Sequence, residues 1–335
     1  LSAGRVQSAA VKLIIDRDRL RAKFLKTTYF DLQAMLFKDE NESNFNATLF
    51  RVDNKRIASS QDFKADTGRL KNKDVILLTD VQAKDLVKEL KTGSWQVSKI
   101  EEKPRTSNPR PPFTTSTLQQ EAARKLRMSA RQTMRNAQQL YENGFITYMR
   151  TDSTHLSEEA ISGSRQIITD LYGDDYLPGE ANRYKTQVRN AQEAHEAIRP
   201  AHRQFRTVDE VQSILGKDTA KLYDLIWKRT IASQMLPAKL KQTAVTIQNQ
   251  KTEFRANGQV ILFPGYMRVY VEGRDNPEAD LANKERILPA LAEGDLLTCT
   301  ELESQSHTTK PPARFTEASL VKNLETNGIG RPSTF

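Results

Sequence analysis

Apolar side chains recur at helical spacing in the first segment of the chain, from Val6 to Phe24. Positions 6, 10, 13, 14 and 20 are apolar and fall on one side of a helix with 3.6 residues per turn. The other side carries a row of basic residues, namely Arg5, Lys12, Arg17, Arg19, Arg21 and Lys23. The pattern therefore predicts an amphipathic helix whose basic face is either solvated or turned toward a polyanion.

From Thr27 onward the apolar period shortens toward two, which is typical of strands. One group of short apolar runs precedes residue 106, together with a helix predicted from a cap at Asp80 to about Leu90. A second group follows residue 237. The runs are 29–36, 47–51, 75–78 and 95–100 in the first group, and 244–247, 260–263, 268–271 and 296–299 in the second. These two β-rich halves, 27–106 and 237–306, are predicted to form one domain.

Helix signals dominate the segment between the two halves. The prolines between Lys103 and Phe113 predict a linker, because proline breaks helices and this stretch has little to bury. Helices are expected to start near Thr117, Ser129, Ser157, Thr207 and Asp218, and to stop at Gly144, Gly173 and Pro237. The segment 107–236 is therefore predicted to be a helical insert, and the chain to be a multidomain α+β protein.

One short stretch of this insert, Phe145 to Ser153, combines an apolar run with a polar turn. The run predicts a strand end at which Tyr148 and Arg150, two residues apart, point to the same side. A phenol beside a guanidinium provides a nucleophile and a bidentate ligand for phosphate. Because neighbouring Tyr and Arg residues usually only pack together, this pair alone does not select a function.

Composition restricts the partners of the chain. The 51 Lys and Arg residues outnumber the 42 Asp and Glu residues, which gives a net charge of +9 and favours a polyanionic partner. No apolar run is long enough for a membrane span, and the first residues lack the charged-then-apolar order of a signal peptide, so no membrane partner is expected. The single cysteine, Cys299, excludes an internal disulfide and indicates a reducing, cytoplasmic location. A phosphate loop of the G-x-x-x-x-G-K type is also lacking, so ATP is not expected.

Several longer motifs resemble one family. Tyr148-Met149-Arg150-Thr151-Asp152-Ser153 is similar to the active-site motif of bacterial type IA DNA topoisomerases. Segments 2–8 (Ser-Ala-Gly-Arg-Val-Gln-Ser), 193–200 (Glu-Ala-His-Glu-Ala-Ile-Arg-Pro) and 328–334 (Gly-Ile-Gly-Arg-Pro-Ser-Thr) resemble the same family in the same order. Segment 310–315 also reads like family sequence.

This resemblance implies a fold and its domain boundaries. The expected fold is the type IA topoisomerase arch, in which a helical domain carrying the active-site tyrosine, 107–236, is inserted into the β-rich domain. Segments 1–26 and 307–335 would be partial pieces of a helical DNA-binding domain at both ends. The chain is expected to be a monomer and to bind single-stranded or negatively supercoiled DNA.

The resemblance also implies a reaction and a set of site residues. Tyr148 would attack one strand to form a transient 5′-phosphotyrosine bond, a second strand would pass, and religation would relax negative supercoils without ATP. Arg150 and His195 would assist at the phosphate. The residues expected to contact DNA are Arg5, Arg17, Gln138, Glu142, Thr147, Asp152, Arg199 and Arg331.

The family's Toprim module, which holds Mg²⁺ on an acidic cluster, has no counterpart before Gly4. The metal is therefore expected to be bound outside this chain, and the chain alone is expected to be inactive. The alternative is a catalytically silent module that binds single-stranded DNA. Tyrosine recombinases fit less well, because their tyrosine follows a His-x-x-Arg motif, whereas Tyr148 precedes His195, and His195 and Arg199 are four residues apart.

Overall fold

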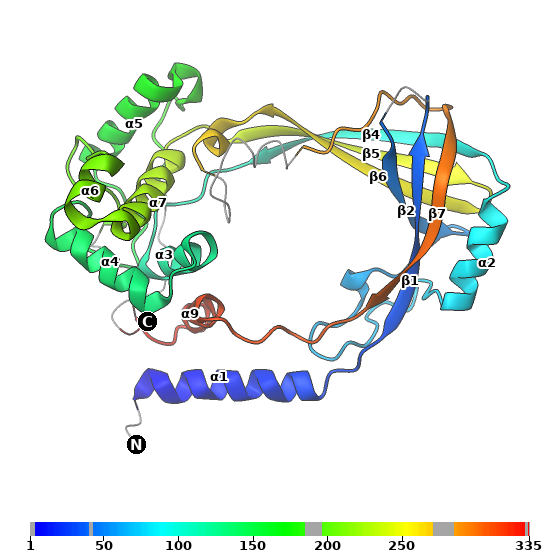
Figure 1. Ribbon diagram of the computed structural model, residues 1–335, viewed down its shortest axis with the longest axis horizontal. Coiled ribbons are helices and arrows are strands. Elements are labelled where there is room, and N and C mark those ends of the chain that lie inside the picture. Colours follow the sequence, from blue (N-terminus) through cyan, green and yellow to red (C-terminus); the bar gives the residue numbers. More distant parts are fainter. Residues whose placement is uncertain (1–3, 40–42, 185–195, 271–284, 332–333, 335) are drawn as a thin grey trace.

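The computed structural model of the chain describes residues 4–39, 43–184, 196–270, 285–331 and 334. Its elements are arranged as a ring (Figure 1). A helical unit forms one side and a strand-rich unit forms the other, and the long strands β4 (Trp95–Ser107), β5 (Ala238–Asn249) and β6 (Thr252–Phe263) connect them. Helices α1 (Arg5–Ala22) and α9 (Glu317–Thr326) lie along the opposite edge of the ring, so both ends of the chain come near the helical unit.

The strand-rich unit is an antiparallel barrel. Its remaining strands are β1 (Thr28–Phe37), β2 (Phe45–Val52), β3 (Lys55–Arg56) and β7 (Leu296–Thr308). The order is β1-β7-β4-β5-β6-β2-β3, and an additional β1–β2 pairing closes the sheet. Alternate side chains of these strands, such as Leu32, Phe254 and Ile247, are fully buried inside it. Helix α2 (Asp80–Leu90) adds Ala83, Leu86 and Leu90 to the same core.

Strand β4 runs further than the sequence predicted. Residues 103–107 were expected in a linker, yet Pro104 pairs with Lys241 and the ladder continues to Ser107. Strand β4 meets β7 only at Trp95 and Gln96, so one side of β4 is a free edge at Pro104. Proline is tolerated there because its missing N–H costs no ladder bond.

The helical unit lies between β4 and β5. It consists of α3 (Thr115–Glu121), the π-helical turn η2 (Ala122–Leu126), α4 (Ala130–Glu142), α5 (Glu158–Tyr172), η3 (Asp174–Tyr176), α6 (Val208–Leu215) and α7 (Lys217–Ser233). Leu118, Leu140, Ile198 and Tyr223 are fully buried in its core. The chain is thus an α+β protein, as predicted.

Several helix caps lie where the sequence predicted them. The Ser129 hydroxyl accepts from Gln132 N, Ser157 from Ala160 N and Thr207 from Glu210 N. The first cap of the unit was placed wrongly, because Thr114 rather than Thr117 accepts the capping bond and Thr117 occupies the third helical position. Similarly, Thr79 rather than Asp80 caps α2.

Two predicted strands are absent from the described residues. The run 75–78 forms only single bridges, such as Ile57 to Ile76. The run that begins at Arg268 is instead the end of a 3₁₀ turn, η4 (Gly265–Arg268), followed by buried Val269 and Tyr270. Val269 and Tyr270 pack in the core of the helical unit, whereas Val75 and Leu78 are buried in the strand-rich unit, so the hydrophobicity of both runs reflects burial and not sheet pairing.

Helix α1 is held by the chain segment that returns from β7. The Arg17 guanidinium donates to Ala313 O at 3.0 Å and stacks on the Phe315 ring at 4.2 Å, and Arg21 donates to Pro312 O at 2.5 Å. The apolar side chains Val11, Ile14, Ile15 and Leu20 of this helix are more than two-fifths exposed. Among the described residues no helix combines the length and the hydropathy that a membrane span needs.

Helix α9 closes the ring against the helical unit. Glu325 Oε2 accepts from the Ser116 hydroxyl at 2.5 Å, and Glu317 Oε2 accepts from the Ala130 backbone N at the start of α4, at 2.8 Å. Val321 and Leu324 of α9 are buried. Polar and apolar contacts therefore join the C-terminal part of the chain to α3 and α4.

Candidate active site and nucleic-acid surface

Tyr148 lies in a loop that follows α4, not at the end of a strand. Gly144, with φ +71°, ends the helix, and only Ile146 forms a β-bridge, with Pro200. The expected strand at 145–148 is therefore wrong. The apolar residues of this run are there because Phe145 and Ile146 enter the core of the helical unit.

Hydrogen bonds hold this loop on both sides of the tyrosine. Before it, the Thr147 hydroxyl donates to Ala197 O at 2.7 Å, and Arg199 N donates to the same hydroxyl at 3.0 Å. After it, the fully buried Thr115 hydroxyl donates to Met149 O at 2.8 Å and accepts from Thr151 N at 2.9 Å. The backbone around Tyr148 is thus fixed to two distant parts of the chain.

The side chains of the loop divide between core and solvent. Met149 is 5% exposed and packs in the core, whereas Tyr148 is 41% exposed and Arg150 is also exposed. The phenol and the guanidinium are therefore both accessible, with Met149 as the anchor between them. A nucleophile and a phosphate ligand can meet a substrate from solvent at this point.

Tyr141 is a neighbour of Tyr148 that the sequence analysis did not find. The two rings meet edge to face, with centroids 5.3 Å apart and planes at 65°. This geometry restricts the orientation of the exposed Tyr148 ring. Tyr141 lies in α4 and Tyr148 in the loop after it, so the helical period does not predict their contact. Thr115 lies in α3, and no sequence pattern connects it to the Tyr148 loop.

Gln138 and Glu142 lie on the exposed side of α4, next to Tyr141. The Gln138 amide donates to Glu142 Oε1 at 2.7 Å. Both predicted DNA contacts therefore lie on the helix that leads into Tyr148, and both side chains are exposed.

The C-terminal segment brings a further predicted residue to the same loop. Arg331 Nη1 lies 3.8 Å from Asp152 Oδ2, and the Asp152 side chain is only 12% exposed. The Asp152 carboxylate partly neutralises Arg331 and so links the C-terminal segment electrostatically to the Tyr148 loop.

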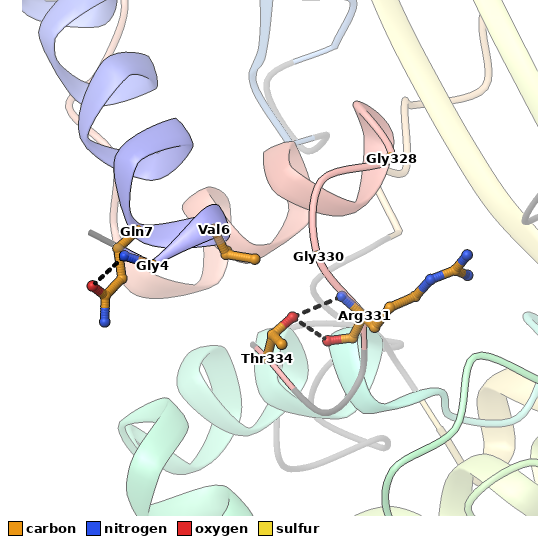
Figure 2. Close-up of a pocket in the computed structure, with 7 residues that line it drawn as sticks. All are labelled: Gly4, Val6, Gln7, Gly328, Gly330, Arg331 and Thr334. Carbon is orange, nitrogen blue, oxygen red and sulfur yellow. Dashed lines mark hydrogen bonds between the residues drawn. The ribbon is translucent and has the colours of Figure 1, made fainter. Parts of the chain in front are cut away.

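A cavity of about 690 Å³ lies where the two ends of the chain meet (Figure 2). In Figure 2 the segments from Gly4 to Gln7 and from Gly328 to Arg331 face each other across it. Gln7 Oε1 accepts from Gly4 N at 3.3 Å, and Thr334 Oγ1 accepts from Arg331 N at 2.8 Å. The pocket residues are Gly4, Val6, Gln7, Gly328, Gly330, Arg331 and Thr334. Two of the motifs that carry the family resemblance thus come together in space.

The two residues of α1 predicted to contact DNA, Arg5 and Arg17, lie in different surroundings. Arg5 is the first residue of α1, close to this cavity in the chain, whereas Arg17 is half-buried against Phe315. A contact between Arg17 and DNA would have to coexist with that stacking and with its bond to Ala313 O.

Arg199 is placed differently from the prediction. Its side chain is 6% exposed, and Nη2 donates to Glu196 Oε2 at 2.7 Å and to the Ser157 hydroxyl at 3.2 Å. Burial opposes the ionisation of Glu196, but the hydrogen bonds from Arg199 and Ser157 outweigh it and lower the pKa of that carboxyl. This burial does not support a direct DNA contact. Arg199 instead fixes the 196–201 segment on which Thr147 rests.

His195 lies outside the described residues, so its place relative to Tyr148 stays a prediction. Within the described ranges, no three His, Cys, Asp or Glu side chains come together as a metal site. The described residues therefore do not fit a Mg²⁺ ion.

Comparison with known proteins identifies the family of the chain. The sequence model of the DNA topoisomerase family matches residues 1–335. The chain belongs to the bacterial type IA DNA topoisomerases. DNA topoisomerase 1 of Synechococcus elongatus is 52% identical over 336 residues, and that of Streptomyces coelicolor is 48% identical over 345. Each alignment covers 100% of this chain, but only 38% and 36% of those relatives.

A solved member of this topoisomerase family has a similar fold. The full-length topoisomerase I of Thermotoga maritima matches with a TM-score of 0.73 and 33% identity, and the match covers 100% of this chain and 50% of that one. The chain therefore spans well under two thirds of these topoisomerases. It is similar to a part of them, and that part includes the Tyr148 loop.

Proposed function

We propose that this chain is the strand-holding part of a bacterial topoisomerase I, in which Tyr148 is the nucleophile for transient cleavage of one DNA strand. The observation that carries the proposal is the Tyr148 loop. Its backbone is fixed by Thr115 and Thr147, while the phenol and the Arg150 guanidinium stay accessible. A preoriented nucleophile beside a cation suits attack on a phosphodiester.

In the proposed reaction the Tyr148 oxygen attacks phosphorus and the bond from phosphorus to the 3′-oxygen breaks. The phenol gives up its proton, and the departing 3′-oxygen gains one, so charge and atoms balance. Arg150 stabilises the charge on the non-bridging oxygens, and His195 is the second candidate for this role. Reversal restores the strand after another strand has passed, which relaxes negative supercoils without ATP.

The general acid and the Mg²⁺ ion of this reaction are proposed to come from parts of the enzyme outside this chain. Support comes from the lengths, since the relatives are more than twice as long as this chain. Loss of acid–base help alone lowers a rate by about 10²–10⁴. The isolated chain should therefore neither cleave nor relax DNA.

The test is a covalent-adduct assay with a longer protein that contains this chain. A single-stranded oligonucleotide, Mg²⁺ and denaturing mass spectrometry should reveal a DNA adduct on Tyr148. The Tyr148→Phe variant should form none, and Tyr141→Phe, which keeps the nucleophile, should still form it. An adduct on another residue, or one that survives in Tyr148→Phe, would refute the assignment.

The second candidate is a silent module that binds single-stranded DNA, favoured by the +9 charge and by the cavity between the two ends of the chain. The same assay separates the two. A longer protein that binds the oligonucleotide but never forms an adduct, with or without Mg²⁺, would support the binding module.

A further inference from the structure

A second cavity of about 690 Å³ lies on the barrel, away from the Tyr148 loop. Its walls include Asp31 of β1, Thr48 and Phe50 of β2, Arg56, and Arg255 and Asn257 of β6. We refer to it as the barrel pocket. Chain neighbours of these residues, such as Leu32, Ala47 and Phe254, are buried in the barrel core, so the pocket residues lie on the outer face of the sheet.

Arg255 is the unusual residue of the barrel pocket. Its guanidinium carbon lies 3.6 Å from the centre of the Phe50 ring, which fixes the plane of the guanidinium. Its Nε is buried, and no group among the described residues accepts a hydrogen bond from it. A buried donor without an acceptor is costly, so such a group in a native protein usually has a partner from solvent or a ligand.

Arg51 offers a direct comparison on the same ring. Its guanidinium carbon lies 4.9 Å from the Phe50 centroid, but it forms an ion pair with Glu253 at 3.1 Å. Arg51 does not line the barrel pocket. Of the two guanidiniums on Phe50, Arg255 is thus the one that has a cavity beside it and no acidic partner within ion-pair distance among the described residues.

The acidic residues of the pocket have partners of their own. Asp62 accepts from both terminal nitrogens of Arg56 and from Ser59 N and Oγ, at 2.8 and 2.9 Å for the serine. The Arg56 hydrogen bonds hold the pKa of Asp62 far below its usual value, so this carboxylate stays charged and paired. Asp31 Oδ1 lies 3.0 Å from His307 Nε2, a close contact that does not have hydrogen-bond geometry. Among the described residues, Arg255 therefore has no acidic partner at ion-pair distance, and Glu101 acts on it only from further away.

We infer that the barrel pocket binds a phosphate group of a DNA strand, with Arg255 as the principal donor. Thr48 pairs with Arg255 in the β2–β6 ladder, and Thr48 and Asn257 are exposed beside it as further hydrogen-bonding groups. A guanidinium already held against a ring loses little freedom when it binds a phosphate. Since β2 and β6 lie across the ring from α4, the pocket would hold DNA at a second point, far from Tyr148 (Figure 1). This inference rests on the proposed function for its choice of DNA.

The test compares Arg255→Met with Arg51→Met. Each variant keeps an apolar chain on Phe50 and removes one positive charge, but only the first removes a pocket residue. Binding of a fluorescent single-stranded oligonucleotide to the 335-residue chain is followed by anisotropy at several salt concentrations. Arg255→Met should weaken binding about tenfold and reduce the salt slope by about 0.7, the value for one phosphate contact on a single strand. Arg51→Met should change the affinity by less than about twofold.

A further variant and thermal melting distinguish the possible outcomes. Arg255→Lys, which retains charge but not the flat stacking, should fall between wild type and Arg255→Met, and thermal melting checks that each variant is folded. Equal losses in Arg255→Met and Arg51→Met would mean a general charge effect and would overturn the inference. Unchanged DNA binding of Arg255→Met would also overturn the inference. If inorganic phosphate then raised the melting temperature of the wild type but not of Arg255→Met, the pocket would bind free phosphate and not DNA. If the wild type bound no DNA, the proposed function itself would fail.

Discussion

Replacing Thr115 by valine should loosen the loop that carries Tyr148. The Thr115 side chain is fully buried, and its hydroxyl is the donor to Met149 O and the acceptor for Thr151 N. Valine has nearly the same shape but leaves the Thr151 N–H, in a residue that is 2% exposed, without its acceptor. An orphaned buried donor costs about 1–3 kcal/mol, and the unpaired Met149 carbonyl adds to it, so we expect a loss of about 2–4 kcal/mol.

Urea unfolding followed by far-ultraviolet circular dichroism measures this loss. With a slope of about 1–3 kcal/mol per molar urea, the midpoint should fall by roughly 1 M or more. Thr230→Val is the matched control, because Thr230 is equally buried but its hydroxyl only donates to Ile226 O, one turn back in α7. That variant should lose less than about 1 kcal/mol, since the Ile226 carbonyl keeps its helical bond. If Thr115→Val were as stable as wild type, or no less stable than Thr230→Val, the proposed support of the loop would be refuted.

Three further predictions use the same chain. Folding lowers the pKa of Glu196 from 4.5, so the ionised carboxylate stabilises the folded state at higher pH, and this stability is lost as the pH falls through the folded pKa. In urea unfolding measured at several pH values, Glu196→Gln should therefore lose less stability toward acid pH than the wild type. Ser116→Ala removes the 2.5 Å hydrogen bond to Glu325 and should speed amide hydrogen exchange in α9 but not in the barrel. If α9 exchanged equally fast in the variant and the wild type, this bond would not hold α9 on the helical unit. Burial raises the pKa of Cys299, so iodoacetamide at neutral pH should alkylate it more slowly than glutathione until urea unfolds the chain.

Local features of this fold could be predicted well from the sequence. Helix caps need only a Ser or Thr at the right distance from a backbone N–H, and so Ser129, Ser157 and Thr207 were found without any knowledge of the tertiary structure. Short apolar runs also located parts of strands β5, β6 and β7, and those of β5 and β7 place Val245, Ile247 and Leu297 in the barrel core.

What the sequence analysis missed depends on contacts between distant segments. Glu196 lies only three residues from Arg199, but the sequence does not show that the distant Ser157 also binds this guanidinium and that the side chain is buried. The support of the Tyr148 loop likewise comes from Thr115, which lies in helix α3, far from the loop in the sequence. The short apolar run before Tyr148 was assigned to a strand because burial in a helical core and in a sheet leave the same hydrophobic signature over four residues.

The strand order of the barrel has a consequence for how the chain is assembled. Strand β7 lies between β1 and β4 in the sheet, although it comes after every other strand in the sequence. During synthesis, β1 can pair early with β2 from Gln33 to Leu36, but its longer pairing with β7, from Thr28 to Phe37, must wait until residue 308 has been made. Pairing of β4 with β5 also needs Ser107 and Ala238 to meet across the helical unit, and closing a flexible loop of that length costs on the order of 4 kcal/mol. A helical unit that folds first, with Arg229 bonded to Pro111 O at 2.7 Å near its two ends, would remove most of that cost. The segment with the reactive tyrosine would then act as the template on which the barrel is later completed.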